Sequence, residues 1–332
     1  MEEPRVWDVV IIGGGPAGLA AALYAARALR STVVLESNFP GGQIYTTGDV
    51  EDYPGIIHTT GPELSMMLKD HAEHFGARIE IGEEVVDVDF QPPIKRVRVA
   101  SGKEYQGRTV IVATGAAPRT LGVPGEDELR GKGVSYCAVC DGPFFRERHV
   151  VVAGGGDAAF DEGLYLTKYA SRVTIIHRRD AFRAQKVLVD RAMKNPKIDF
   201  ILDTVIDRVN GNGAIESIDI RNVKSGATER LEIGGLFVYI GSDPNTSLFN
   251  SCVTIDRGGF INTDENMATD CDGVFVAGDV RRNPLKQVVT AGADGSIAAL
   301  TADKYLDLLD AGDTPDEAEA IATSKLSWKN EY

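Results

Sequence analysis

The feature that most constrains the fold is a glycine-rich pattern that occurs twice in this chain of 332 residues. Each copy begins with an apolar run, passes through a turn of small residues into a helix-forming stretch, and ends with a second apolar run. An apolar run without alternation is typical of a parallel strand that is buried on both faces. The turns carry Gly13, Gly15 and Gly18 in the first copy, and Gly154, Gly156 and Ala159 in the second. The chain therefore repeats one strand–turn–helix–strand unit.

Glycine-rich turns of this kind bind the pyrophosphate of a dinucleotide. Glycine lets the backbone turn tightly and approach the phosphate, whose charge is favoured by unpaired N–H groups at the start of a helix. One such turn is a weak signal, but here both copies follow a strand and open a helix. Alanine at the third position, as at Ala159, is a known variant of the pattern. The sequence therefore predicts an α/β protein with two Rossmann-like nucleotide-binding domains.

The residue that ends the second strand of each copy distinguishes the two predicted sites. Glu36 lies where a carboxylate accepts hydrogen bonds from a ribose hydroxyl, and it would repel a 2′-phosphate. The first site therefore suits FAD or NAD. The second copy has His177, Arg178 and Arg179 at this place, with Arg183 close behind. Because guanidinium groups bind phosphate oxygens bidentately, the second site suits NADPH rather than NADH.

Two further strand-and-glycine runs, 110–115 and 274–279, indicate the domain boundaries. The second run is expected to join the first sheet, so that the chain leaves the first domain and later returns to it. Prolines at positions 118, 124 and 244 lie near the proposed crossings, where linkers often carry proline. We predict a first domain of residues 1–117 and 245–332, ending in a tail without pattern from about residue 310, and an inserted second domain of residues 118–244.

The pair Cys137 and Cys140 has the two-residue spacing of reversible dithiol–disulfide couples. A zinc site would need a second pair at similar spacing, and Cys252 and Cys271 are too far apart in sequence to supply it. We therefore expect a redox pair and no metal, with Cys252 and Cys271 as ordinary buried thiols.

Asp141 follows the cysteine pair directly. Its carboxyl group could exchange a proton with the sulfur atoms. It could also cap a helix that opens near Pro143, and both roles can hold together.

Composition excludes several other classes of protein. The formal net charge of -14 argues against nucleic acid as a partner, because phosphate contacts need clustered basic residues. No charged-then-apolar signal segment and no apolar run of about 20 residues occurs, so no membrane association is expected. The few cysteines do not form a secreted disulfide scaffold. We therefore expect a cytoplasmic protein.

The order of these motifs resembles that of the low-molecular-weight, bacterial-type thioredoxin reductases over nearly all of residues 6–305. The matching motifs are Gly-Gly-Gln at 41–43, Ala-Thr-Gly at 113–115, Cys-Ala-Val-Cys-Asp-Gly at 137–142, His-Arg-Arg-Asp-Ala-Phe-Arg at 177–183 and Ala-Gly-Asp-Val at 277–280. The redox pair lies in the second domain, as in that family. The resemblance implies a flavoprotein oxidoreductase that uses FAD and NADPH.

The resemblance also assigns residues to the two cofactors and to the reaction. Cys137, Cys140 and Asp141 match the redox pair and its acid, and Phe144 and Phe145 match an apolar surface for thioredoxin. The FAD positions are Gly13, Gly15, Gly18, Glu36, Gln43, Thr47, Asp52, Gly115, Asp279 and Gln287. The NADPH positions are Gly154, Gly156, Ala159, His177, Arg178, Arg179 and Arg183.

The resemblance implies the following mechanism. NADPH passes a hydride to FAD, and the reduced flavin reduces the Cys137–Cys140 disulfide, with Cys140 as the partner of the flavin. The NADPH domain then rotates, and Cys137 attacks the disulfide of thioredoxin. A homodimer is expected on the same ground.

Several positions depart from the family pattern. Asp52 stands where the family has Asn, Lys286 stands where it has Arg, and Ala158 replaces a small hydroxyl residue. Trp328 and Tyr332 add aromatic residues to the end of the chain, where one of them could stack on the flavin or on a dimer partner.

The alternatives change the electron donor, the acceptor or the class of protein. A ferredoxin-driven reductase or an oxidase of small dithiols would not need the arginine cluster. A peroxide-linked reductase would carry an additional N-terminal region, and a ferredoxin–NADP reductase would lack Cys137 and Cys140. A flavin-binding regulatory protein would not need the intact set of Cys137, Cys140 and Asp141.

Overall fold

The computed structural model describes residues 5–323, which fold into two compact units. Within this range, residues 5–117 and 244–323 form the first unit, and residues 118–243 form the second. The chain crosses between them twice, through β9 (Ala116–Pro118) and β18 (Ser242–Pro244). The α/β fold class with two Rossmann-type domains is confirmed.

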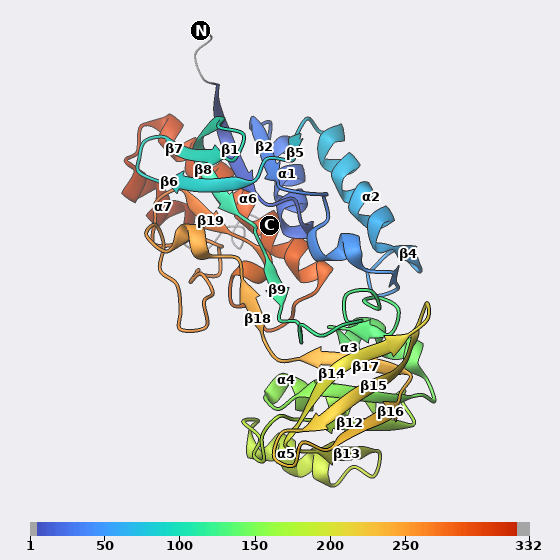
Figure 1. Ribbon diagram of the computed structural model, residues 1–332. Coiled ribbons are helices and arrows are strands. Elements are labelled where there is room, and N and C mark those ends of the chain that lie inside the picture. The colour runs from blue at the N-terminus through green and yellow to red at the C-terminus, as the bar shows by residue number, and fades with distance from the viewer. Residues whose placement is uncertain (1–4, 324–332) are drawn as a thin grey trace, which may run out of the picture. The chain divides into compact units, whose positions relative to one another are not determined.

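The first unit is built on a seven-stranded sheet, whose parallel strands lie between a helical layer and the antiparallel strands of the same sheet (Figure 1). Four of its strands run in the order β5-β2-β1-β8, all parallel, and β19 pairs with the other edge of β8. The expectation that the run near residue 274 joins the first sheet is therefore confirmed. The strands are β1 (Val6–Ile12), β2 (Thr32–Glu36), β5 (Arg78–Ile81), β6 (Val85–Asp89), β7 (Lys95–Val99), β8 (Glu104–Val112) and β19 (Val274–Val276), with β3 (Asp49–Val50) and β4 (Thr59–Thr60) as a separate pair.

Helices α1 (Pro16–Arg27) and α6 (Val288–Ala311) lie side by side in the helical layer, which also contains α2 (Gly61–His74) and α7 (Pro315–Thr323) (Figure 1). Alternate residues of the central strands face opposite sides, as the pleat requires. Val9 and Ile11 pack under the helices, whereas Val10 and Ile12 pack under β6 and β7. This burial on both faces explains why the first apolar run shows no alternation.

The expectation of a tail without pattern from residue 310 is wrong for the described part. Helix α6 continues to Ala311, and α7 follows, with Ala318 and Ala322 buried against the core of the first unit. Thr314 and Glu317 close the start of α7 as a capping box: each backbone N–H donates to the other residue's side chain. Trp328 and Tyr332 lie outside the described residues.

The second unit has a parallel five-stranded sheet in the order β10-β17-β11-β12-β13. Helices cover one face, and a three-stranded antiparallel sheet covers the other (Figure 1). The parallel strands are β10 (Val134–Ser135), β11 (His149–Gly154), β12 (Arg172–Ile176), β13 (Ile198–Ile201) and β17 (Gly235–Tyr239). The antiparallel strands are β14 (Thr204–Gly211), β15 (Ile215–Asn222) and β16 (Thr228–Glu232), and the helices are α3 (Ala138–Asp141), α4 (Asp157–Leu166) and α5 (Lys186–Met193).

Candidate active site

The first glycine turn joins β1 to α1. Gly13 has a φ of 105°, a conformation that favours glycine, and a Cβ on Gly18 would lie 1.9 Å from the carbonyl oxygen of Gly13. A Cβ on Gly15 would instead meet no atom within 4 Å. Gly15 is the N-cap residue of α1, and no side chain caps the helix there. The helix therefore presents unpaired N–H groups beside open space, which suits a phosphate.

Glu36 links the end of β2 to this turn. One carboxylate oxygen accepts a hydrogen bond from the backbone N–H of Gly14 at 2.7 Å, and the other accepts from Asn38 N–H at 2.8 Å. A carboxylate oxygen has two lone pairs, so the buried Glu36 keeps acceptor capacity for a ligand hydroxyl. The structure thus places Glu36 beside the turn, and its contact with a ribose stays a prediction.

The predicted flavin contacts Gln43 and Thr47 lie on a segment that touches the first turn. Gly41 N–H donates to the carbonyl oxygen of Gly14 at 2.7 Å, and the Thr47 hydroxyl donates to the carbonyl oxygen of Gln43 at 3.2 Å. Asp52 lies exposed on the loop between β3 and β4. Within residues 5–323, its side chain makes no hydrogen bond or ion pair that ties it to this turn.

Asp279 lies in a turn of 3-10 helix, Gly278–Val280, directly after β19. Burial raises the pKa of the Asp279 carboxyl, and the nearby charge of Lys286 opposes this effect. Its carboxyl group hydrogen-bonds no other residue in the described part of the chain. A half-buried carboxyl without a protein donor suits a ligand that carries hydroxyl groups.

Two further predicted FAD positions lie at the ends of elements of the first unit. Gly115 follows the strand β8, with a φ of 65° and open space at its Cβ position, and Gln287 precedes α6.

Asp294 on α6 holds the Asp279 turn in place, and the sequence analysis missed it. Its Oδ2 accepts a hydrogen bond from Gly278 N–H at 3.2 Å and pairs with the Arg281 guanidinium at 3.0 Å. Asp294 is buried. The sequence did contain a pattern that could have identified it: Asp294 is the one charged residue between residues 288 and 302. A single charge on a buried helix face needs partners.

The second glycine turn joins β11 to α4 and repeats the geometry of the first with one difference. Gly156 is the N-cap residue of α4, lacks a side-chain cap and borders open space. Ala159 is fully buried, and its methyl group would lie 2.7 Å from a Cβ placed on Gly154. The third position of this turn therefore holds a methyl group, whereas a methyl group at Gly18 in the first turn would meet the carbonyl oxygen of Gly13.

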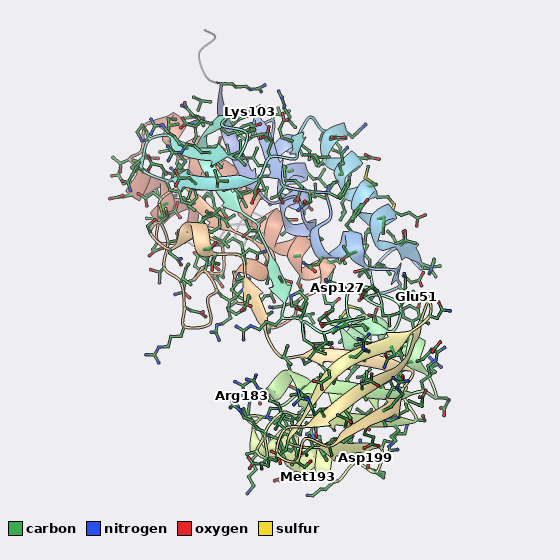
Figure 2. All side chains as sticks on the ribbon, in the orientation of Figure 1. Glu51, Lys103, Asp127, Arg183, Met193 and Asp199 are labelled. Atoms are coloured by element: carbon green, nitrogen blue, oxygen red, sulfur yellow. A yellow bond between two sulfur atoms is a disulfide. The ribbon has the colours of Figure 1, made fainter. Side chains whose placement is uncertain are left out.

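The loop that carries the arginine cluster is attached to the second turn. Arg183 N–H donates to the carbonyl oxygen of Gly155 at 2.8 Å, and Asp157 accepts from Gln185 N–H at 2.7 Å. Arg178, Arg179 and Arg183 are exposed, and none of their guanidinium groups forms an ion pair or hydrogen bond with residues 5–323. Figure 2 shows Arg183 at the surface of the second unit. Three unpaired guanidinium groups beside a phosphate-binding turn favour an additional phosphate on the ligand.

His177 lies under the second turn, where a Cβ on Gly155 would lie 2.3 Å from its ring nitrogen Nδ1. Its other nitrogen, Nε2, is buried and has no hydrogen-bond partner within the described range. Burial lowers the pKa of His177, and the positive charges of Arg183, Arg179 and Arg178 lower it further. These effects favour the neutral ring, and its Nε2 lies in the interior under the turn.

Cys137 and Cys140 form a disulfide of 2.14 Å at the start of α3, and both residues are partly exposed. Cys137 is the N-cap residue of the helix, and its sulfur accepts a hydrogen bond from Cys140 N–H at 3.2 Å. Ser135 holds the preceding backbone by accepting from Cys137 N–H at 3.0 Å. After reduction, the same N–H donor would stabilise a thiolate on Cys137.

The helix after the cysteine pair begins earlier than the capping hypothesis for Asp141 assumed. Helix α3 starts at Ala138, and Asp141 is its last residue. A 3-10 turn, Gly142–Phe145, follows, and the Asp141 side chain makes no capping hydrogen bond to it. The structure thus removes the capping role and leaves the proton-transfer role as a prediction.

The two phenylalanines of this 3-10 turn point in different directions. Phe144 is 40% exposed, whereas Phe145 is buried and packs edge-on against Phe237 with ring centroids 5.0 Å apart. The expectation that both rings form an apolar surface for a partner is therefore wrong for Phe145. A 3-10 helix has about three residues per turn, so neighbouring side chains point in different directions, and only Phe144 remains available.

Cys252 and Cys271 are free thiols that pack against the core of the first unit, and burial raises the pKa of Cys271 to about 11. Within residues 5–323, no group of three or more His, Cys, Asp and Glu side chains could hold a metal ion. Over the same range, no helix has both the length and the apolar character needed to cross a membrane.

The model of the pyridine nucleotide-disulphide oxidoreductase family matches residues 7–295. A thioredoxin reductase of Peptoclostridium acidaminophilum is 48% identical over 310 residues, which cover 91% of this chain and 98% of that protein. A thioredoxin reductase of Bacillus subtilis is 45% identical, with coverage of 93% and 98%.

Solved structures give the same result. The thioredoxin reductase of Streptococcus pyogenes superposes with a TM-score of 0.88 at 44% identity and covers 92% of this chain and 99% of its own. The thioredoxin reductase of Giardia duodenalis has a TM-score of 0.86 at 39% identity, with coverage of 91% and 99%. The chain therefore belongs to the pyridine nucleotide-disulphide oxidoreductase family and, within it, to the thioredoxin reductases.

Proposed function

We propose that this chain is an NADPH-dependent thioredoxin reductase, in which electrons from NADPH pass through FAD to the Cys137–Cys140 disulfide and then to thioredoxin. The observation that carries this proposal is the partly exposed disulfide in the same unit as the arginine-flanked glycine turn. The bound cofactors supply hydride acceptance and two-electron storage, and the residues of this chain hold them and manage the sulfur chemistry.

The first unit fits FAD. Its glycine turn offers uncapped N–H groups beside Gly15, and Glu36 keeps acceptor capacity for a ribose. Asp279 would accept hydrogen bonds from the hydroxyl groups of the ribityl chain. Gly13 and Gly18 would keep the turn tight enough for the pyrophosphate.

The second unit fits NADPH. Gly156 borders the open space where a pyrophosphate would bind, and the attached loop would place Arg178, Arg179 and Arg183 around the 2′-phosphate. His177 would support this site from beneath the turn, where its ring lies against Gly155. Unpaired guanidinium groups would discriminate against NADH, which has no 2′-phosphate.

The cysteines would perform distinct steps. Cys137 would attack a disulfide sulfur of thioredoxin as a thiolate, which the Cys140 N–H stabilises. The resulting mixed disulfide would be resolved by Cys140, which regenerates the Cys137–Cys140 disulfide and releases the thioredoxin dithiol. Asp141 would donate and accept the protons that these sulfur atoms exchange.

Steady-state kinetics with single cysteine variants test this proposal. Cys140→Ser and Cys137→Ser should each abolish NADPH oxidation that depends on thioredoxin, because neither variant can form or regenerate the disulfide. Cys271→Ser, in the first unit, is the matched control and should keep the wild-type rate. Thioredoxin-dependent turnover in Cys140→Ser would contradict the proposal. Rotation of the second unit and the homodimer stay predictions from the resemblance, and the cytoplasmic location stays a prediction from composition.

A further inference from the structure

Tyr239 contacts the redox helix from a strand that the sequence analysis did not associate with it. Tyr239 is the last residue of β17, and its hydroxyl oxygen accepts a hydrogen bond from Ala138 N–H at 2.5 Å. Ala138 is the first residue of α3 and directly follows Cys137. One phenol group therefore fixes the backbone between the two redox cysteines.

Glu162 on α4 lies beside the same hydroxyl group, and α3 and α4 pack against each other. Its Oε2 is buried and has no hydrogen-bond partner in the described residues. Burial raises the pKa of the Glu162 carboxyl, the charge of the exposed Asp161 adds to this effect, and the Tyr239 hydroxyl opposes it. Such a carboxyl is costly to keep buried, so a function for it is expected.

The phenol stays protonated across the neutral range. Burial raises the pKa of Tyr239, and the negative charges of Glu162 and Asp141 raise it further. A protonated phenol that already accepts the Ala138 N–H still has its own O–H to donate, and the adjacent acceptor is the Glu162 carboxylate. Polar groups thus connect Glu162, through the Tyr239 hydroxyl group, to the backbone next to Cys137.

We propose that Tyr239 and Glu162 are positioning residues for the dithiol. Tyr239 holds α3 so that the Cys140 N–H stays on the Cys137 sulfur, and the charge of Glu162 limits how readily the Cys137 thiol loses its proton. The inference rests on the proposed function, in which Cys137–Cys140 is the redox centre, and it adds two residues that act on the cysteines through α3.

The two residues have opposite effects on the Cys137 thiolate. Loss of the Tyr239 hydroxyl loosens the N–H donor that stabilises the thiolate, so the thiolate becomes scarcer. Loss of the Glu162 charge removes a nearby negative charge, so the thiolate becomes more abundant. General damage to the helix would move both variants in the same direction.

The test measures the alkylation of Cys137 in the full-length, flavin-loaded protein. The protein is reduced with dithiothreitol, freed of reductant under argon and treated with iodoacetamide between about pH 5 and about pH 9, a range that spans thiol ionisation. Mass spectrometry of the Cys137 peptide keeps Cys252 and Cys271 from contributing. The variants are Tyr239→Phe, which keeps the ring, and Glu162→Gln, which keeps the shape and the hydrogen-bonding oxygen.

Below the thiol pKa, Tyr239→Phe should be alkylated roughly two- to ten-fold more slowly than the wild type, the range expected for one hydrogen bond. Glu162→Gln should be alkylated roughly two- to ten-fold faster, as for one nearby charge. The rates should converge at high pH, where every variant is fully ionised. The matched control, Glu229→Gln on the exposed strand β16, should follow the wild type.

A change in the same direction for both variants, or profiles that match the wild type, would overturn the inference. Rates that stay apart at high pH would do the same, since they would indicate altered access to the sulfur. The measurement uses neither NADPH nor thioredoxin. A failure of the inference is therefore distinguishable from a failure of the proposed function, which would appear as absent turnover in the wild-type protein.

Discussion

The two glycine turns of this chain follow the same plan and differ at two positions. In the first, a Cβ at the third glycine, Gly18, would collide with the Gly13 carbonyl oxygen at 1.9 Å; in the second, Ala159 occupies the equivalent place. The first turn is flanked by Glu36, whose carboxylate is hydrogen-bonded to the turn itself. The second is flanked by three exposed guanidinium groups that have no ion-pair partner within residues 5–323.

This comparison shows that the glycine turn and the residues beside it have different tasks. Both turns expose uncapped N–H groups at a helix start, which is the part of the site that any dinucleotide needs. The flanking residues then select the ribose, because a carboxylate repels a 2′-phosphate and guanidinium groups attract it. One scaffold can thus serve two cofactors in one chain.

The most severe test of this comparison exchanges the small residue at the third position. Gly18→Ala places a methyl group against the Gly13 carbonyl oxygen, so α1 must shift, at a cost of about 1–3 kcal/mol or more. We expect a purified protein that lacks FAD and has a lower Tm. The reciprocal change, Ala159→Gly, should cost about 1 kcal/mol through helix propensity. Flavin absorbance and thermal unfolding measure both, and a fully flavin-loaded Gly18→Ala protein would show that the close approach is unimportant.

The second test removes one charge of the arginine cluster. Arg179→Ala should raise the Kd for NADPH about 10- to 100-fold, the range for a lost hydrogen bond to a charged group, and leave the Kd for NADH unchanged. Arg191→Ala on α5 is the matched control in the same unit. Fluorescence titration with both nucleotides gives the ratio. Equal weakening of NADPH and NADH would mean that the cluster does not recognise the 2′-phosphate.

The third test neutralises the flank of the first turn. Glu36→Gln keeps an oxygen acceptor for Gly14 N–H but loses the charge, so FAD should bind about two- to ten-fold more weakly. Glu84→Gln, an exposed neighbour after β5, is the control. Reconstitution of the apoprotein with FAD, followed by flavin fluorescence, measures the Kd. Unchanged affinity in Glu36→Gln would argue that the carboxylate only stabilises the turn.

The smallest expected effect concerns pH. Burial and the neighbouring arginines hold the pKa of His177 below its ordinary value in the free protein, and a bound 2′-phosphate would raise it. Binding should then take up protons between these two pKa values, so the NADPH affinity gains about two- to three-fold as the pH falls through that window. Calorimetry in buffers of different ionisation enthalpy counts the protons. His177→Gln should reduce the proton uptake, and equal uptake in both proteins would exclude His177 as the group that binds the proton.

The sequence predicted the structure well where it depends on residues close together in the chain, and it predicted the family well because the motifs are specific. The strands 6–12 and 32–36, the turn between them and the α/β class follow from an apolar pattern, and the comparisons confirm the family. The individual cofactor contacts and the domain assignments stay predictions. The contact of Asp52 with the flavin is one of these predictions, and the structure places Asp52 exposed on the loop between β3 and β4.

The missed residues depend on long-range contacts. Tyr239 meets Ala138 across 101 residues, and no local pattern marks that pairing. Phe145 was assigned to the surface because two adjacent aromatic residues gave no indication of which one the 3-10 turn would bury. Helix α7 was missed because its core contacts are two alanines, which give a weak apolar pattern. Its capping box, Thr314 with Glu317, was a readable signal.

The central claim is that electrons pass from NADPH to the Cys137–Cys140 disulfide and on to thioredoxin. Anaerobic stopped-flow absorbance of the flavin tests it most directly, with NADPH or NADH mixed first and thioredoxin disulfide added second. The account predicts rapid bleaching with NADPH but not with NADH, followed by recovery of the oxidised spectrum when thioredoxin is added. A flavin that stays oxidised with NADPH, or that bleaches but does not respond to thioredoxin, would contradict it.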